Sequence, residues 1–580
     1  MKTERRFQGV AVSPGIARGF AFVHRPEEVN PPRRRVTDVE AEIVRLNDAL
    51  TSTRRQIGDL HQEMAKSLGA KDAAVFEAHL MVVDDGSLIN EVHTTIKSEQ
   101  CNAEHGYWSV MQRYARSFAQ IDDPYLRERA VDIHDVARRV IHNLMGKNHV
   151  GLAALPSPHI VFAHNLTPSD TAQMNRANVL GFGTETGGRT SHTAIIARSL
   201  GIPAVVGLHA ILDQIENDSE VLLDGYSGMV VVNPTEQTLY EYGELQTKRR
   251  LVESTLVELR ERTSTTKDGR HVVLSANIET PEDAATAVSC GAEGVGLFRT
   301  EFLYLGRRDL PTEEEQFAAY QKVADTVKDQ GVIIRTLDLG GDKLHSILSA
   351  TDEENPFLGW RAIRVCLERT EVFKAQLRAI LRASTKRNVK IMFPMISGME
   401  ELHRAKAILA ECRDELRREG RPFDEDIPVG MMVEVPSAAV IADLLAREVD
   451  FFSLGTNDLV QYTIAADRGN ERIAHLYEPT HPGVLRLIKQ TADAGRAAGI
   501  WTGVCGEMGG DITMTPLLVG LGVDELSCGV AVLPRVKRAV RSLDSAACRR
   551  LADEALACGS GAGILAKCEA VARDHYGELF

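Results

Sequence analysis

A histidine begins an amphipathic, helix-like stretch within the N-terminal half of the chain. Residues 187–198 read GGRTSHTAIIAR, in which a glycine pair and a polar turn precede an apolar run with helical spacing. Thr190 or Ser191 would cap this helix by accepting a backbone N–H bond. The residues expected to form its buried face and then to end it are Ile195, Ile196 and Leu200, followed by Gly201 and Pro203.

His192 would therefore lie in the first turn of that helix. Free backbone N–H groups and the positive end of the helix dipole favour an anion at this place, and Arg189 and Arg198 add positive charge. An imidazole that accepts a phosphoryl group would be well served there. Taken alone, these residues fit a partly buried histidine without chemistry equally well.

Composition indicates an acidic globular protein of several domains. The 580 residues exceed one ordinary core and predict two to four domains. The formal net charge of −14 argues against a nonspecific nucleic-acid binder. The nine cysteines are scattered and form no C-x-x-C pair. The N-terminus lacks the apolar core of a signal peptide, and no run approaches about 18 apolar residues, so we expect a cytoplasmic protein without membrane insertion.

The first half of the chain predicts a helical block placed between strands. Residues 7–24 read as two short strands around Pro14-Gly15, and 25–36 read as a linker. Residues 37–144 show helical periodicity, and the expected helices are 43–68, 72–84, 86–98, 103–120 and 124–145. Alternating strand and helix patterns return over 158–233, with strands expected at 159–163, 179–182, 205–206 and 221–232. A long connecting helix is expected over 235–262.

From residue 268 onward, strand and helix patterns alternate repeatedly. The strand candidates are 272–278, 294–299, 332–337, 389–395, 429–435, 451–456, 501–505 and 525–528. Eight parallel strands with intervening helices predict a (β/α)8 barrel of the TIM type. Polar residues follow the C-terminal ends of these strands, which is where such barrels carry their sites.

The segment GGRTSHTAIIAR resembles the phosphohistidine signature of enzyme I, the phosphoenolpyruvate-protein phosphotransferase family of the bacterial phosphotransferase system. The opening GVAVSPGIA is similar to the start of that family. Pyruvate phosphate dikinase and phosphoenolpyruvate synthase carry a related stretch, but they need a large ATP-binding domain ahead of it. Because the phosphohistidine domain is expected to begin near residue 1, the domain order favours enzyme I.

The resemblance implies a multidomain α/β protein. Its expected parts are a phosphohistidine α/β domain of residues 1–30 and 146–233, a helical insert of 31–145, a linker helix of 234–262 and a phosphoenolpyruvate-binding (β/α)8 barrel of 263–580. The insert would bind a small histidine phosphocarrier protein. Its expected docking residues are Phe76, His79, Leu80 and Met81. Ala70 and Lys71 stand where family members often have acidic residues, which leaves the identity of the carrier open. A structural bundle is the alternative interpretation of these helices.

The barrel segments GLFRTE, IRTLD, MVEVP, GTNDL and CGEM resemble the phosphoenolpyruvate-binding barrel of enzyme I and the dikinases. The resemblance implies substrate contacts from Arg299, Arg335, Asn457, Asp458 and Arg468, with Lys343 and Arg361 as auxiliaries. Guanidinium forks match phosphate geometry. Glu434 and Asp458 would hold Mg²⁺, which prefers oxygen ligands.

Two further roles follow from the same resemblance. Cys505 would protonate the pyruvate enolate as a general acid, although a lone cysteine is more often a small buried hydrophobe. Thr171 would hold one imidazole nitrogen of His192. The implied reaction is transfer from phosphoenolpyruvate to His192 and then to a carrier histidine, with release of pyruvate, as the first step of sugar uptake. A homodimer through the barrel is expected. The alternative is a phosphoenolpyruvate-sensing regulatory protein or a nitrogen-type phosphotransferase.

Overall fold

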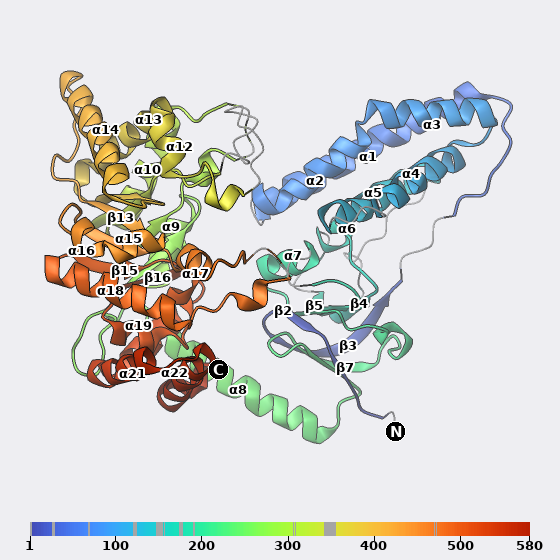
Figure 1. The fold of residues 1–580 in the computed structure, drawn as a ribbon. Coiled ribbons are helices and arrows are strands. Elements are labelled where there is room, and N and C mark those ends of the chain that lie inside the picture. The colour runs from blue at the N-terminus through green and yellow to red at the C-terminus, as the bar shows by residue number, and fades with distance from the viewer. Residues whose placement is uncertain are drawn as a thin grey trace. The chain divides into compact units, whose positions relative to one another are not determined.

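The chain forms two compact units, Met1–Thr247 and Lys248–Phe580. The structure is a computed structural model, and Figure 1 shows its elements. It describes residues 3–25, 30–67, 70–119, 124–146, 155, 157–172, 174, 178–188, 192–305, 307, 309–340, 355–468, 470 and 472–580. Over these residues, no helix combines the length and apolar character that a membrane crossing requires.

A mixed sheet forms the base of the first unit. Its strands are β1 (Arg5–Gln8), β2 (Val10–Ser13), β3 (Ile16–His24), β4 (His159–Ala163), β5 (Val179–Thr184), β6 (Ala204–Val206), β7 (Glu220–Asp224) and β8 (Met229–Val232). Within the described residues, the order across the sheet is β1-β8-β7-β3-β4-β5-β6-β2. Neighbours β3, β4, β5 and β6 are parallel, and the remaining pairs are antiparallel.

The N-terminal stretch differs from the prediction of two strands. Three strands form, because Gly9 separates β1 from β2 and lets them pair with opposite ends of the sheet. A Cβ at Gly9 would lie 2.6 Å from the carbonyl oxygen of Val206. Glycine is therefore required where the chain changes partner, and alternation of apolar residues does not reveal such a change.

Five helices follow β3 and confirm the predicted helical block. They are α1 (Val39–Ser67), α2 (Ala70–Val83), α3 (Gly86–Glu99), α4 (Ala103–Ala119) and α5 (Pro124–Leu144). Their apolar stripes meet in one core that includes Leu46, Val92, Val110 and Val140. Figure 1 shows α1 beside α2 and α4 beside α5 as long antiparallel pairs.

Helix α7 (His192–Leu200) joins this helical core to the sheet. Ala194 and Ala197 pack toward the sheet, whereas Ile196 is fully buried in the helical core. The prediction was wrong for Ile195, which is 37% exposed. Successive helical residues point about 100° apart, so Ile195 and Ile196 cannot share one narrow face. The small alanines let the helix lie close to the sheet.

The second unit contains a closed barrel that confirms all eight predicted strands. In the described part of the chain, its strands are β9 (Val273–Ile278), β10 (Val295–Phe298), β11 (Val332–Arg335), β12 (Val389–Phe393), β13 (Val429–Val433), β14 (Phe451–Leu454), β15 (Trp501–Val504) and β16 (Glu525–Gly529). All neighbours are parallel, and β16 closes on β9. Leu297, Ile333, Met392 and Met432 belong to a small apolar cluster.

Helices surround the barrel and connect it to the first unit. α8 (Glu236–Glu258) crosses the boundary, and Val252 and Leu256 pack against the core of the barrel unit. Within the described residues, the other α-helices of this unit are α9 (Asp283–Ser289), α10 (Glu313–Val327), α12 (Ile363–Glu368), α13 (Thr370–Ala383), α14 (Met399–Arg418), α15 (Pro436–Val440), α16 (Ala442–Leu445), α17 (Thr456–Ile464), α18 (Pro482–Ala498), α19 (Thr515–Leu521), α20 (Leu533–Ser542), α21 (Ser545–Ala557) and α22 (Gly561–Tyr576).

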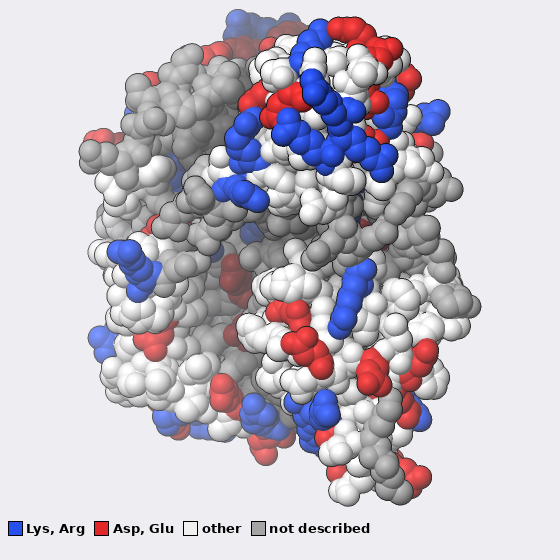
Figure 2. All heavy atoms as spheres, turned by 90° about the vertical axis from the view of Figure 1, so that its right-hand side faces the viewer, with Lys and Arg blue, Asp and Glu red and all other residues white. Residues whose placement is uncertain are grey.

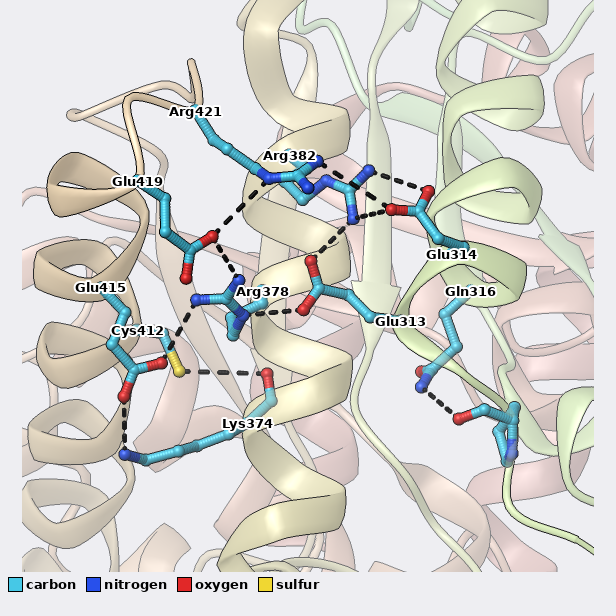
Figure 3. A network of polar contacts seen from close by, with 11 residues as sticks. Glu313, Glu314, Gln316, Lys374, Arg378, Arg382, Cys412, Glu415, Glu419 and Arg421 are labelled. Carbon is cyan, nitrogen blue, oxygen red and sulfur yellow. Dashed lines mark hydrogen bonds and ion pairs between the residues drawn. The ribbon is translucent and has the colours of Figure 1, made fainter.

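A network of ion pairs links three of these outer helices (Figure 3). Arg378 of α13 lies 2.7 Å from Glu313 of α10 and 3.3 Å from Glu415 of α14, and it also pairs with Glu419 at 2.8 Å. Arg382 pairs with Glu313 at 2.7 Å. Because the two arginine side chains are largely buried, the network holds α10, α13 and α14 in register on the barrel.

The surface is charged in both signs. Figure 2 shows lysine and arginine side chains interspersed with aspartate and glutamate over one face. Many of the exposed charges are paired locally, as Arg33 is with Glu99 at 3.3 Å and Lys97 with Glu40 at 3.1 Å.

Candidate functional site

The polar residues predicted at the barrel strand ends gather at one rim of the barrel. Arg299 follows β10, Arg335 ends β11, and Glu434 follows β13. Cys505 follows β15 directly. All strands run in parallel, so their C-terminal ends meet at the same mouth. The sequence spacing that placed these residues after strands thus brings them together in space.

One carboxylate, Asp338, binds two of the predicted arginines at once. Its Oδ2 lies 2.8 Å from Arg335 Nη1, and its Oδ1 lies 2.8 Å from Arg361 Nη2. Arg335 Nη2 also lies 2.6 Å from Glu301 Oε1. Burial acts to raise the pKa of the Asp338 carboxyl, but the guanidinium groups of Arg335 and Arg361 outweigh burial and hold that pKa below its ordinary value. Asp338 therefore stays ionised and fixes both arginines.

The two arginines keep their charge despite burial. Burial lowers the pKa of the Arg335 guanidinium, but the neighbouring carboxylates of Glu301 and Asp338 raise it well above its ordinary value. Asp338 and Asp458 do the same for Arg361. Fixed guanidinium charges in a dry site are what a transferring phosphoryl group needs. Asp338 and Glu301 were not predicted as site residues, although Asp338 stands three residues after Arg335 in the IRTLD segment.

Glu434 and Asp458 form the pair of carboxylates predicted to bind a metal. Both are buried, and the backbone N–H of Met395 donates to Glu434 Oε1 at 2.7 Å. Burial raises the pKa of the Glu434 carboxyl to about 8, and the neighbouring charges of Asp458 and Asp338 add to that rise. A Cβ at Gly455 would lie 2.6 Å from Glu434 Oε2, so the glycine leaves that oxygen room.

These observations fit a hard cation held at this pair. A divalent ion would stabilise the charged form of Glu434, which burial and the charge of Asp458 disfavour, and oxygen ligands suit Mg²⁺. Among the residues that the structure describes, no group of three or more His, Cys, Asp and Glu side chains is arranged to hold a metal ion. A metal ion held at this rim would therefore depend on the carboxylate pair.

Cys505 lies buried at the rim with its thiol protonated. The side chain is 3% exposed, and its Sγ donates to the carbonyl oxygen of Leu454 at 3.6 Å. Burial raises the pKa of the Cys505 thiol to about 11. Asn277 Nδ2 donates to the Cys505 carbonyl oxygen at 2.9 Å and fixes the backbone there. A thiol that keeps its proton at neutral pH can act as a general acid.

An open cleft of about 1210 Å³ lies over this rim. Arg299, Asn457 and Cys505 line it, together with Glu279 and Glu507. Arg299 Nη1 lies 3.3 Å from Glu279 Oε1. The cleft brings three of the predicted site residues to one accessible space, which is large enough for a small anionic substrate and for a side chain that reacts with it.

Arg468 joins the cleft residues through Glu507. Its Nη1 lies 3.6 Å from Glu507 Oε1, and its backbone N–H donates to Gln461 Oε1 at 3.2 Å. Asn457 Nδ2 donates to the same Glu507 oxygen at 3.3 Å. Glu507 belongs to the CGEM segment but was not predicted as a site residue. Lys343, the remaining predicted barrel residue, lies outside the described residues.

In the first unit, α7 begins at His192, which confirms its predicted place in the first turn of a helix. Thr190 and Ser191, the predicted capping residues, lie outside the described part of the chain. The helix ends as predicted, since Gly201 has φ +59° and its N–H donates to the Arg198 carbonyl at 3.0 Å. The first turn of a helix carries backbone N–H groups without partners inside the helix, and such groups can bind an anion.

Thr171 lies buried on the short helix α6 (Pro168–Ala172). Its hydroxyl oxygen lies 3.1 Å from the Thr167 carbonyl oxygen and 3.0 Å from that of Pro168, so the hydroxyl proton is directed into its own turn. The hydroxyl oxygen keeps lone pairs and can still accept a bond from an imidazole N–H. Asp170 caps this turn by accepting from the Thr167 N–H at 3.1 Å.

The four predicted docking residues on α2 differ in exposure. Phe76 is fully buried in the helical core, and His79 is buried with its Nε2 3.3 Å from Asp132 Oδ1. Buried side chains of this kind stabilise the helix pair and do not present a surface to a partner. Leu80 is partly buried, and Met81 is 75% exposed. A docking role through direct contact therefore remains open for Leu80 and Met81 and does not fit Phe76 and His79.

Comparison with known proteins identifies the family. Three family models match: "PEP-utilising enzyme, N-terminal" over residues 8–129, "PEP-utilising enzyme, mobile domain" over 155–228 and "PEP-utilising enzyme, PEP-binding domain" over 253–545. The chain is 44% identical to the phosphoenolpyruvate-protein phosphotransferase of Staphylococcus carnosus over 561 residues, which cover 97% of this chain and 98% of the relative.

Two further relatives carry the same name. The protein of Priestia megaterium is 47% identical over 542 residues, which cover 93% of this chain and 95% of the relative. That of Geobacillus stearothermophilus is 44% identical over 562 residues and 97% of either chain. The similarity spans both compact units and the whole barrel rim. The chain therefore belongs to the family of phosphoenolpyruvate-protein phosphotransferases.

Proposed function

We propose that this chain transfers the phosphoryl group of phosphoenolpyruvate to His192 and then to a histidine of a small phosphocarrier protein, with release of pyruvate. In this role it would begin the phosphotransferase sequence of sugar uptake in the cytoplasm. The observation that carries the proposal is the barrel rim. Arg299, Asn457 and the protonated thiol of Cys505 line one cleft there, and two fixed arginines and a buried carboxylate pair lie at the ends of the same set of parallel strands. Membership of the family supports the same reaction.

On the barrel side, guanidinium groups bind the substrate. Arg335 and Arg361 are held by Asp338, so their positions are fixed before substrate arrives. Arg299 and Arg468 are more exposed and can adjust to the phosphate, and Asn457 can donate a hydrogen bond from its amide. Preorganised positive charge stabilises the oxygens of the phosphoryl group as it moves.

The proton balance assigns a role to Cys505. When the P–O bond of phosphoenolpyruvate breaks, its electron pair leaves with the enolate of pyruvate, which must gain a proton at its terminal carbon. The Cys505 thiol donates that proton and becomes a thiolate, which solvent reprotonates. Burial raises the pKa of the thiol to about 11, so the proton is present at neutral pH.

Glu434 and Asp458 would hold Mg²⁺. When bound, the cation would neutralise negative charge on the substrate oxygens. Replacing either carboxylate by its amide removes a charged oxygen ligand, so Glu434→Gln and Asp458→Asn should each raise the magnesium concentration needed for activity. The two arginines that face this pair would remain in place, because Asp338 holds them independently.

On the acceptor side, His192 at the start of α7 would attack phosphorus with one imidazole nitrogen. Thr171 would accept the N–H of the other nitrogen through its hydroxyl oxygen. The helix N-terminus would stabilise the phosphohistidine. The carrier would dock on the helical insert near Leu80 and Met81, and the enzyme would dimerise through its barrel.

The function is tested by measuring pyruvate release from phosphoenolpyruvate with a purified histidine phosphocarrier protein and Mg²⁺. We expect a stoichiometric amount of pyruvate without the carrier and continued release with it, both lost in EDTA. A carrier whose histidine is replaced by alanine serves as the control. Continued pyruvate release without any histidine acceptor would contradict the proposal.

A further inference from the structure

Glu507 lies between two of the residues proposed to bind the substrate phosphate. Its Oε1 accepts from Asn457 Nδ2 at 3.3 Å and lies 3.6 Å from Arg468 Nη1. The side chain is 81% exposed and lines the cleft beside Cys505. The Glu507 oxygen therefore occupies the N–H donors of Asn457 and Arg468, the same donors that would bind a phosphate oxygen of the substrate.

The carboxylates of this site fall into two kinds. The side chains of Asp338 and Glu301 are largely shielded from water, and they pair with Arg335 at 2.8 and 2.6 Å. Glu507 is open to water and makes only long contacts with Arg468 and Asn457. Exposed ion pairs are weak because water screens them and solvates the released charge. Glu507 can therefore leave its partners at little cost.

The backbone of Glu507 fixes Asn457 independently of its side chain. The Glu507 N–H donates to Asn457 Oδ1 at 2.9 Å, so the amide of Asn457 keeps its nitrogen directed toward the cleft. Tyr477 donates from its hydroxyl to the Asn457 carbonyl at 3.3 Å and adds to this orientation. A change in the Glu507 side chain alone would leave the donor in place and remove the competing charge.

We propose that Glu507 is an affinity-setting residue, whose carboxylate occupies the donors of Asn457 and Arg468 until the phosphate of phosphoenolpyruvate displaces it. This inference rests on the proposed function of the same cleft. The carboxylate keeps the two donors directed at the cleft while the site is empty, and its repulsion of a second anion lowers substrate affinity. Product release is eased in the same way, because the carboxylate can return to the donors.

The test is the equilibrium dissociation constant of phosphoenolpyruvate, measured with Mg²⁺ by calorimetry on the full chain in a His192→Ala background. Glu507→Gln should tighten binding by about two- to fivefold, the range expected for an exposed charge pair. Glu478→Gln is the matched control, because Glu478 lines the same cleft and has no contact with Arg468 or Asn457 among those described. It removes the same unit of charge and should change affinity less.

Unchanged or weaker binding in Glu507→Gln, or an equal gain in Glu478→Gln, would overturn the inference. Because the readout is binding without turnover, it is separate from the proposed function, which fails if the wild-type chain releases no pyruvate. The thermal midpoint of both variants should match that of the parent, since Glu507 is exposed. In the wild-type background, Glu507→Gln should lower KM for phosphoenolpyruvate and should not raise kcat, because the carboxylate that eases product release is gone.

Discussion

Asp338 fixes the position and the charge of Arg335 and Arg361, the two most buried arginines of the predicted site. Its carboxylate oxygens pair with one guanidinium nitrogen of Arg335 and one of Arg361, each at 2.8 Å. The other guanidinium nitrogens are left for further contacts. Arg361 Nη1 donates to the Tyr462 hydroxyl at 3.1 Å, and Tyr462 donates onward to the Phe357 carbonyl at 2.5 Å. The charge of the two arginines proposed to bind phosphate is thus set by neighbours outside the proposed substrate contacts.

Cys505→Ser should slow pyruvate formation at least tenfold and leave the dissociation constant of phosphoenolpyruvate within about twofold, because the proton is needed only after the phosphoryl group begins to leave. Only the protonated thiol can donate the proton. Burial raises the pKa of the thiol to about 11, so the protonated form is present below that pH and is lost above it. Single-turnover rates from pH 7 to 10 should therefore show no fall attributable to this residue.

The contrary result for Cys505 would be a large loss of affinity with a normal rate of pyruvate formation. Cys528→Ser is a suitable control, since that buried cysteine is the next-to-last residue of β16 and burial raises the pKa of its thiol to about 12 in the same way. It should not alter the rate of pyruvate formation if proton donation belongs to Cys505 alone.

Much of the candidate site follows from the sequence, because residues such as Arg335, Glu434 and Cys505 stand at the ends of apolar strand patterns. Asp338 and Glu507 were missed for a physical reason. Their importance comes from which side chains they contact across the rim, and those contacts depend on distances that residue type and spacing do not give. The burial of Phe76 and His79 was not predicted either, because apolar residues occur all around α2 and do not mark one buried face.

Among the elements, the barrel was the most predictable part of the fold. Fully buried parallel strands give short apolar runs, and eight such runs separated by helical patterns leave few other architectures. The N-terminal strands were less predictable. At Gly9 the chain passes from pairing with β8 to pairing with β6, and the alternation of apolar residues continues across this change. The face of α7 was misjudged at Ile195, where small alanines and not the large residue pack on the sheet.

The ion-pair network of Figure 3 should stabilise the barrel measurably. Arg378→Met keeps the apolar length of the side chain but leaves the carboxylates of Glu313, Glu415 and Glu419 without their shared partner. We expect a loss of about 1–2 kcal/mol in the free energy of unfolding of the barrel unit, measured by denaturant titration.

Arg417→Met is the matched control for the network, because Arg417 pairs with Glu425 at 2.6 Å in the same region but lies half exposed. Water screens that pair, so no measurable change in unfolding is expected. Equal effects of the two substitutions would show that the buried network contributes nothing beyond an ordinary surface pair.

At the scale of the whole molecule, the acceptor and the substrate site belong to different compact units. His192 lies in the unit of residues 1–247, and every barrel residue of the site lies beyond 248. In-line transfer needs reacting atoms about 3–3.5 Å apart, and the same histidine must also reach a carrier. One imidazole cannot serve both places at a fixed geometry, so we expect a hinge motion of the phosphohistidine domain.

The division at Thr247 and Lys248 predicts what each half can do alone. A fragment of residues 1–247 should exchange phosphate reversibly with a phosphorylated carrier protein and should not react with phosphoenolpyruvate. A fragment of residues 248–580 should bind phosphoenolpyruvate with Mg²⁺ in calorimetry without becoming phosphorylated on histidine. Each fragment keeps its own core, as Val252 and Leu256 pack with the barrel.

Direct labelling of the short fragment by phosphoenolpyruvate would show that the barrel is not the substrate site. Mixing the two fragments should restore little transfer, because the covalent link keeps the effective concentration of the acceptor high. A full-length chain assayed beside them at the same concentration gives the reference rate.

The most direct test of the account is labelling of the full chain with ³²P-phosphoenolpyruvate and Mg²⁺, in the wild type and in His192→Ala. The account predicts one acid-labile, base-stable phosphate per wild-type chain, mapped by mass spectrometry to His192, and none on a folded His192→Ala variant. His159→Ala, a change at a buried histidine of the same unit, is the control and should keep the label. Full labelling of His192→Ala would contradict the central claim.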